Sequence, residues 1–288
     1  MSVNVKTENG LLQIAGNTLP AVDSELSELN QSVADLKNSN TNLAKSLANY
    51  NGKNLKSFYT PTEFKEKISN GDFTNLELGD YYEITLSGDE ENTNHPWGDG
   101  ETIKYVISGF NTYLNYGKNN ILTNNHIIMT SVDCMFGTMK MNETDDNTGG
   151  YAASLMPTYL EKVFERFPEE WKNVIRPLDR LENNKSKADW ATRNLFLLSE
   201  TEINGYSIKA DDYFERGTRP LPLYQFSSRY RIKGHGFNSS SNGIRAPYWT
   251  ASPLKDSSIG FSIITYNGLV DFCDSSSDFV GVATGFCI

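Results

Sequence analysis

The most regular apolar pattern of the chain lies near its N-terminus, over residues 21–51. Nine positions there are spaced alternately by four and three residues without a break, and the residues between them are mostly Ser, Asn, Asp, Glu and Lys. They are Val22, Leu26, Leu29, Val33, Leu36, Asn40, Leu43, Leu47 and Tyr50. Such a narrow stripe is typical of a coiled-coil seam, whereas a helix packed on its own domain usually has a wider one. We therefore predict an oligomerising coiled coil, with a single amphipathic helix as the alternative.

Asn40 occupies an a position of these heptads, where a polar residue lowers stability and fixes register and strand number. Asn at a favours a dimer in simple zippers, but polar layers also occur in trimers, so the pattern leaves the strand number open. Residues 1–20, before the coiled coil, include only a few apolar residues and two glycines. A segment this short does not fold alone, and we expect it to dock onto another protein.

Beyond residue 51 the periodicity changes to that of short, mixed elements. Thr60-Pro61-Thr62-Glu63 has the form of a helix start, and Phe64 and Ile68 follow on one face. Apolar and aromatic runs predict strands at Tyr81–Leu86, Ile103–Phe110, Asn111–Tyr116, His126–Ser131 and Asp189–Leu198. Gly149-Gly150 leads into an amphipathic helix expected over Tyr151–Phe167.

The end of the chain predicts a three-stranded meander. Asn267-Gly268 separates two runs rich in β-branched and aromatic residues, 259–266 and 269–273, and Asn-Gly is the strongest short-range hairpin signal. In a third run, four apolar residues all lie at even-numbered positions, so they would share one face of a half-buried strand. These residues are Val280, Val282, Phe286 and Ile288.

Composition narrows the classes of function. The net charge is -10 and the pI is about 4.9, which argues against nucleic acid as a partner because phosphate binding needs a basic face. No apolar run approaches the roughly 18 residues of a membrane span, and the N-terminus lacks the pattern of a secretory signal. We expect synthesis in a cytoplasm and no membrane insertion.

The residues that usually carry chemistry form no recognisable motif. The three histidines and three cysteines are far apart and lack metal-ligand spacing, and no serine lies in a GxSxG elbow. Asp271, Asp274 and Asp278 are close in sequence, but an exposed acidic loop explains them better than Ca²⁺ binding. We predict no metal, no cofactor and no enzymatic role. The cysteines are interpreted as buried thiols, with a Cys273–Cys287 disulfide as the alternative.

Several segments, read in order, carry a resemblance to a known family. They are GGYAASLMPTYLEKVFERFPEEW, NLFLLSETEI, GTRP, YWTASP and the terminal GVATGFCI. This succession resembles a C-type-lectin-like domain family common in prophages and Gram-positive bacteria, and the resemblance covers Phe58–Ile288. The chain departs from that family at Ala283-Thr284, where Arg-Pro is usual. The resemblance implies an α+β fold over residues 55–288, with an antiparallel sheet, few helices and long loops.

The order of segments is also similar to that of phage tail and baseplate proteins, in which a docking segment precedes a trimerising coiled coil and a receptor-binding head. This similarity implies a homotrimer in a virion tail, attached to other tail or baseplate proteins through residues 1–20. Its head would bind a host cell-surface glycan or protein. The alternatives are a structural tail component without a receptor, and an enzyme on a scaffold similar to formylglycine-generating enzymes.

In such receptor binders the last strands and their loops present side chains to the partner. Ser, Asn, Asp and Tyr supply adaptable hydrogen bonds at low entropic cost. The ligand-binding residues that the resemblance implies are Lys255, Asp256, Ser257, Tyr266, Asn267, Asp271, Phe272, Asp274, Ser275, Ser276, Ser277 and Asp278, flanked by Asn238 and Ser239.

Overall fold

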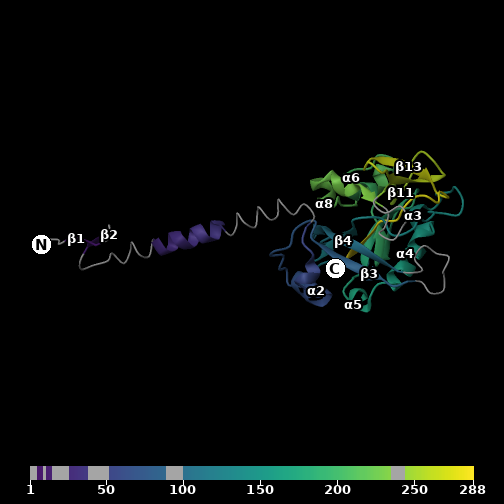
Figure 1. The fold of residues 1–288 in the computed structure, drawn as a ribbon. Helices are drawn as coiled ribbons and strands as arrows, with labels where there is room; N and C mark the ends of the chain where they lie inside the picture. Colours follow the sequence, from purple (N-terminus) through teal and green to yellow (C-terminus); the bar gives the residue numbers. More distant parts are fainter. Residues whose placement is uncertain (1–4, 9–10, 15–25, 38–51, 89–99, 235–243) are drawn as a thin grey trace. The chain divides into compact units, whose positions relative to one another are not determined.

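The chain divides into two compact units, Met1–Asn51 and Gly52–Ile288, which we call the stalk segment and the head. A computed structural model describes residues 5–8, 11–14, 26–37, 52–88, 100–234 and 244–288 (Figure 1). In the stalk segment, β1 (Val5–Glu8) and β2 (Leu11–Ile14) pair antiparallel.

Residues 26–37 of the stalk segment form a helix, as the heptads predict. Its four heptad positions, Leu26, Leu29, Val33 and Leu36, are 54%, 60%, 41% and 63% exposed. The apolar stripe is therefore largely exposed along this helix. The remaining heptad residues lie outside the described ranges; they are Val22, Asn40, Leu43, Leu47 and Tyr50.

A five-stranded antiparallel sheet forms the centre of the head, in the order β3-β4-β5-β14-β8. Its strands are β3 (Tyr81–Leu86), β4 (Glu101–Phe110), β5 (Ile127–Ser131), β8 (Leu195–Leu197) and β14 (Thr284–Cys287). The ring of Phe286 in β14 lies 4.9 Å from that of Tyr105 and 6.1 Å from that of Trp171. The closing strand thus anchors the aromatic core.

Four helices lie near this sheet. They are α2 (Pro61–Ser69), α3 (Gly150–Ala153), α4 (Met156–Glu165) and α5 (Glu169–Lys172). The start of α2 is fixed locally because Thr60 and Glu63 form a capping box, and Phe64 and Ile68 are buried. The helix predicted at this position and the strand predicted at β3 are confirmed.

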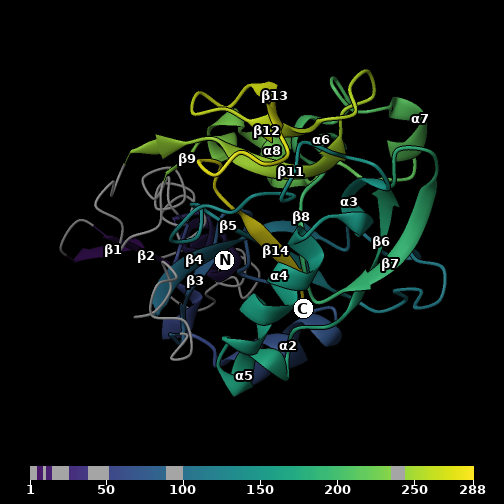
Figure 2. The ribbon, with the colours of Figure 1, turned by 90° about the vertical axis from the view of Figure 1, so that its right-hand side faces the viewer.

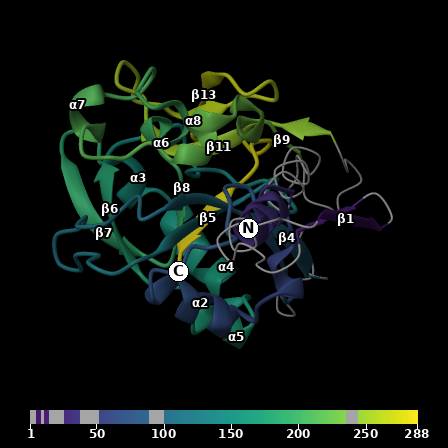
Figure 3. The same ribbon diagram turned by 90° about the vertical axis from the view of Figure 1, so that its left-hand side faces the viewer.

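A second sheet of three antiparallel strands has the order β11-β12-β13. Its strands are β11 (Tyr248–Pro253), β12 (Gly260–Ile264) and β13 (Val270–Asp274). The other elements are two hairpins, β6 (Leu178–Asn183) with β7 (Ala188–Arg193) and β9 (Lys233–Gly234) with β10 (Arg245–Ala246), together with α6 (Glu200–Asn204), α7 (Asp212–Glu215), α8 (Pro222–Phe226), η1 (Leu55–Ser57) and η2 (Ser228–Arg231). In both Figure 2 and Figure 3 the β11-β12-β13 sheet lies at one end of the head, and α2 and α5 lie at the other.

The head is therefore of mixed α and β structure, with antiparallel sheets and few, short helices, as expected. Among the described residues no helix is both long and apolar enough to cross a membrane.

The predicted terminal meander is wrong in its last strand. β12 and β13 form the expected hairpin, but their third partner is β11, and β14 crosses to the central sheet between β5 and β8. All four residues of β14 are buried, so the strand is covered on both faces. Apolar alternation predicted a half-buried strand that began at Val280, whereas β14 begins at Thr284 and has no exposed face. Such a pattern also contains no information about the neighbours of the strand.

Three other sequence predictions need correction. Residues 111–116 form turns instead of a strand, since Asn111 and Asn115 have left-handed backbones with φ of 50° and 58°. The long helix predicted from Tyr151 is interrupted at Ser154, whose backbone is extended and ends α3 before α4 begins. The run 189–198 divides into β7 and β8, which belong to different sheets.

Candidate binding surface

The turn between β12 and β13 lies where Asn-Gly predicts it, but its geometry differs from a two-residue turn. The Gly268 N–H donates to Thr265 O at 2.9 Å, and the Thr265 N–H donates to Leu269 O at 2.8 Å. Tyr266 and Asn267 therefore occupy the central positions, and Gly268 follows with φ of 82°. This is a three-residue loop in which only the glycine needs a left-handed backbone.

The hairpin separates the predicted ligand-binding residues into two groups. Tyr266 and Asn267 are exposed at its tip, whereas the loops 254–259 and 275–279 lie together at its opposite end. Five residues of strand at about 3.3 Å each place the groups roughly 15 Å apart. A small ligand would contact only one group. Asn238 and Ser239 lie outside the described residues.

The two loops at the opposite end are tied to each other and to Asn147. The buried Asn147 amide donates to Ser257 O at 2.9 Å and Gly260 O at 2.6 Å, and the Asn147 N–H donates to Ser258 O at 2.8 Å. The N–H and hydroxyl of Ser275 both donate to Ile259 O at 2.8 Å. Ser275, expected to face a ligand, is thus buried and holds the loops together.

The segment 138–146 supports the second loop from outside. The Asp145 carboxylate accepts from the N–H of Ser276 at 3.0 Å and from its hydroxyl at 2.6 Å, and these bonds lower the pKa of Asp145. Thr138 donates through its hydroxyl to Asp278 O. Ser276 therefore contacts its own chain, whereas the carboxylate of Asp278 is left exposed.

Lys185 is a supporting residue that sequence reasoning missed. Its ammonium group donates to Leu254 O at 2.6 Å and also to Ser257 O. Burial lowers the pKa of Lys185, and the nearby charge of Asp256 opposes that shift. Lys185 lies in the β6–β7 turn, where its φ is 70°. It is about seventy positions from the loop that it holds, and the polar residues around it in the sequence predict only a turn.

Asp271 and Phe272 lie between the two groups, on β13, an edge strand of its sheet. Phe272 is 50% exposed, and the Lys209 ammonium lies 5.1 Å from its ring centroid and 3.7 Å from the Asp271 carboxylate. Lys209 was also missed by sequence reasoning. The charged pair restrains unwanted pairing at this edge.

We define the β13 surface as these residues together with the accessible ones of the two loops. It comprises Lys209, Lys255, Asp256, Ser257, Asp271, Phe272, Asp274, Ser276, Ser277 and Asp278. The surface combines carboxylates, amines, hydroxyls and one aromatic ring. Its backbone is held in place by the hydrogen bonds of Asn147, Asp145 and Lys185. Such a surface can form several hydrogen bonds to a polar partner with little loss of loop entropy.

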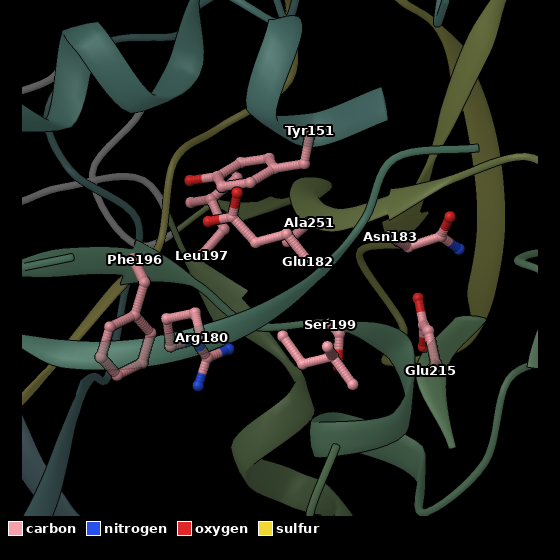
Figure 4. Close-up of a pocket in the computed structure, with 10 residues that line it drawn as sticks. Tyr151, Arg180, Glu182, Asn183, Phe196, Leu197, Ser199, Glu215 and Ala251 are labelled. Carbon is pink, nitrogen blue, oxygen red and sulfur yellow. The ribbon is translucent and has the colours of Figure 1, made fainter. Parts of the chain in front are cut away.

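A group of buried charges lies in the interior around a cavity of about 10 Å³, which has room for about one water molecule (Figure 4). Arg180 binds Glu202 through two hydrogen bonds of 2.5 Å, and its guanidinium also lies 4.1 Å from the Phe196 ring centroid. Arg193 binds Glu182 at 2.8 and 2.9 Å. The charges of these two pairs are compensated within the head, and a cavity of this size holds nothing larger than a water molecule.

Glu215, also at this cavity, is held by hydroxyl groups. Its carboxylate accepts from Thr201 at 2.9 Å, Ser207 at 2.8 Å and Ser252, and burial raises its pKa despite these bonds. Because Ser252 belongs to β11, this contact joins α6 and α7 to the sheet that bears the β13 surface.

The histidine and cysteine residues show no arrangement of a reactive centre within the described residues. His126 is a core residue, as predicted: burial lowers its pKa, and its Nε2 accepts from the Tyr113 N–H at 2.9 Å. The three cysteines are free thiols, and burial raises the pKa of Cys134 and Cys287 to about 12. In the described part of the chain no three His, Cys, Asp or Glu residues are placed to hold a metal ion.

Comparison with known protein families finds a match over the C-terminal part of the chain. A family model described as a domain of unknown function, DUF6273, matches residues 117–288, more than half of the chain. The chain belongs to the DUF6273 family. The DUF6273 segment contains the whole β13 surface, but β3 and β4 precede it although they share a sheet with β5. No curated protein and no solved structure matches the chain.

Proposed function

We propose that this protein is the receptor-binding protein of a phage tail or a phage-like particle. Its head would have a C-type-lectin-like fold and bind a glycan or protein of the host cell surface. Residues 1–20 would attach it to other tail or baseplate proteins in the virion. The order of sequence motifs supports the proposal, as do the antiparallel sheets, short helices and long loops of the head.

The observation that carries the proposal is the β13 surface. Its loops are held by the Asn147 amide, the Asp145 carboxylate and the Lys185 ammonium, while Lys255, Asp256 and Asp278 remain exposed to solvent. Preorganised backbone with free polar side chains is what recognition of a polar partner requires, because little entropy is lost on binding. Aromatic Phe272 adds apolar contact at the edge.

The stalk helix supports an oligomer. Its exposed apolar stripe would be buried against identical helices, and burying one Leu or Val contributes about 1.5–3 kcal/mol. The resemblance to phage tail proteins favours a trimer, with a dimer as the alternative. Several weakly binding heads on one stalk would gain avidity toward a cell surface.

Binding of the isolated full-length protein to host cells tests the proposal. Replacing Asp256, Asp274 and Asp278 together with Ala should abolish binding. A matched control removes three exposed carboxylates elsewhere, with Ala at Glu66, Glu161 and Asp212, and should bind like the wild type. A structural tail component would not bind cells even as wild type, and equal binding by the two triple variants would exclude the β13 surface.

The stalk is tested separately by light scattering on the full chain. Leu29→Asn combined with Leu36→Asn should convert the oligomer to monomers, because two polar residues in the seam remove its apolar contact. The control variant, Ser27→Asn with Ala34→Asn, changes positions outside the stripe and should keep the oligomer. A monomeric wild type would contradict the coiled coil.

A further inference from the structure

A cleft of about 300 Å³ opens between the start of α2, the outer edge of β3 and the start of α5. It is lined by Lys56, Tyr59, Thr60, Pro61, Tyr82, Glu83, Thr85, Pro168, Glu170 and Trp171. Because α2 and α5 lie at the end of the head away from the β11-β12-β13 sheet, the cleft is remote from the β13 surface (Figure 2 and Figure 3). Its volume lies at the lower end of the range for small-molecule sites, roughly 300–1,000 Å³.

The cleft is backed by packed and hydrogen-bonded aromatic side chains. Tyr82 and Trp171 meet edge to face with ring centroids 4.9 Å apart, and the Tyr82 hydroxyl donates to Tyr59 O at 2.9 Å. The Lys65 ammonium donates to Asn173 O at 2.8 Å and so joins the helices on either side. The cleft is therefore preformed, and a ligand would bind without a large rearrangement.

The rim carries exposed hydrogen-bonding groups of both kinds. Glu83 and Glu170 present carboxylates and Lys56 an ammonium group, while the Thr85 hydroxyl is already hydrogen-bonded to Thr102 Oγ1 at 2.8 Å. The Lys104 ammonium lies 3.8 Å from Glu83 Oε1, beyond ordinary hydrogen-bond distance, so the Glu83 carboxylate can accept further bonds. Tyr59, Pro61 and Pro168 add apolar surface to the lining.

We propose that this cleft binds a saccharide, as a single neutral pyranose unit with further units extending into solvent. Each sugar hydroxyl both donates and accepts, which suits a rim that mixes two carboxylates with one ammonium group. The C–H bonds of the ring would contact Tyr59 and the prolines. Two carboxylates against one ammonium disfavour an anionic sugar. This site is independent of the proposed receptor surface.

Saturation-transfer NMR on the full-length protein tests the site, with the methyl glycosides of glucose, galactose and N-acetylglucosamine as probes and choline as a cationic comparison. We expect transfer to the ring protons of at least one glycoside. The double variant Glu83→Gln, Glu170→Gln should bind about tenfold more weakly, because it loses two charged acceptors. Both side chains are exposed, so the variant should fold, which circular dichroism checks.

The controls decide between sites. Glu66→Gln with Glu161→Gln and the triple Ala variant of the β13 surface should both bind the glycoside like the wild type. Absence of transfer from every glycoside, transfer to choline alone, or loss of binding in the β13 variant instead of the cleft variant would each overturn the proposal.

Discussion

Replacing Asn147 with Ala should loosen the β13 surface without changing any residue on it. The Asn147 side chain is fully buried and donates to two carbonyls, Ser257 O in the loop before β12 and Gly260 O at its first residue. Removing the amide withdraws both donors. The Asn147 N–H bond to Ser258 O remains, since it belongs to the backbone.

The expected loss of stability depends on the hydrogen bonds that each of the two carbonyls keeps in the Ala variant. Gly260 O still accepts from the Leu254 N–H at 3.2 Å, and Ser257 O still accepts from Lys185. Neither is left unsatisfied, so each lost bond costs its net value of about 1 kcal/mol instead of a full desolvation penalty. Adding the void left by the shortened side chain, we expect the free energy of unfolding to fall by about 2–3 kcal/mol.

Urea denaturation and amide hydrogen exchange measure this effect. The Ala variant should unfold at lower urea, and the amides of residues 254–260 should exchange faster than in the wild type. Asn147→Asp should be worse at neutral pH, because a buried carboxylate faces two carbonyls, and should partly recover in acid, where its neutral form can donate one bond. Exposed Asn124→Asp is the control. A wild-type urea midpoint for the Ala variant would refute this account of the loops.

Three further predictions concern the frame of the head. Burial raises the pKa of Asp179, but hydrogen bonds led by the backbone N–H groups of residues 118–120 outweigh burial and lower it to about 2, below the unfolded value. The ionised Asp179 carboxylate therefore contributes about 2 kcal/mol to the free energy of unfolding above about pH 4, and this contribution is lost as the pH falls toward 2. In the Asp179→Asn variant the free energy of unfolding should lack this fall in acid. Arg180→Met leaves Glu202 buried and unpaired and should cost about 3–5 kcal/mol in urea unfolding, whereas adding Glu202→Gln should recover part of the loss. Gly268→Ala should cost about 1 kcal/mol or more in thermal unfolding, because φ is 82° and the new Cβ would lie 3.1 Å from the Ile232 side chain; an unchanged melting temperature would contradict the turn geometry.

The elements that the sequence predicts well are those specified by residues a few positions apart. The capping box of Thr60 and Glu63, the alternation along β3 and the turn residue Gly268 each act within one turn or strand. The heptads likewise predict the helix over residues 26–37, while their assembly into a coiled coil remains a prediction.

The features that only the tertiary structure decides depend on contacts between distant residues. The placement of β14 beside β5 and β8, and not beside β13, follows from burial of Phe286 in a core assembled from the whole head. The residues that hold the loops of the β13 surface are also distant in sequence from the carbonyls they bind. Asn147 lies 113 positions from Gly260, and Lys185 lies 72 positions from Ser257. Hydrophobic alternation specifies that a strand has a buried face but not which strand covers it, and a polar side chain in a loop does not reveal which distant carbonyl it will bind. The sequence therefore determined the local elements, and chain packing decided which of their side chains are free to meet a partner.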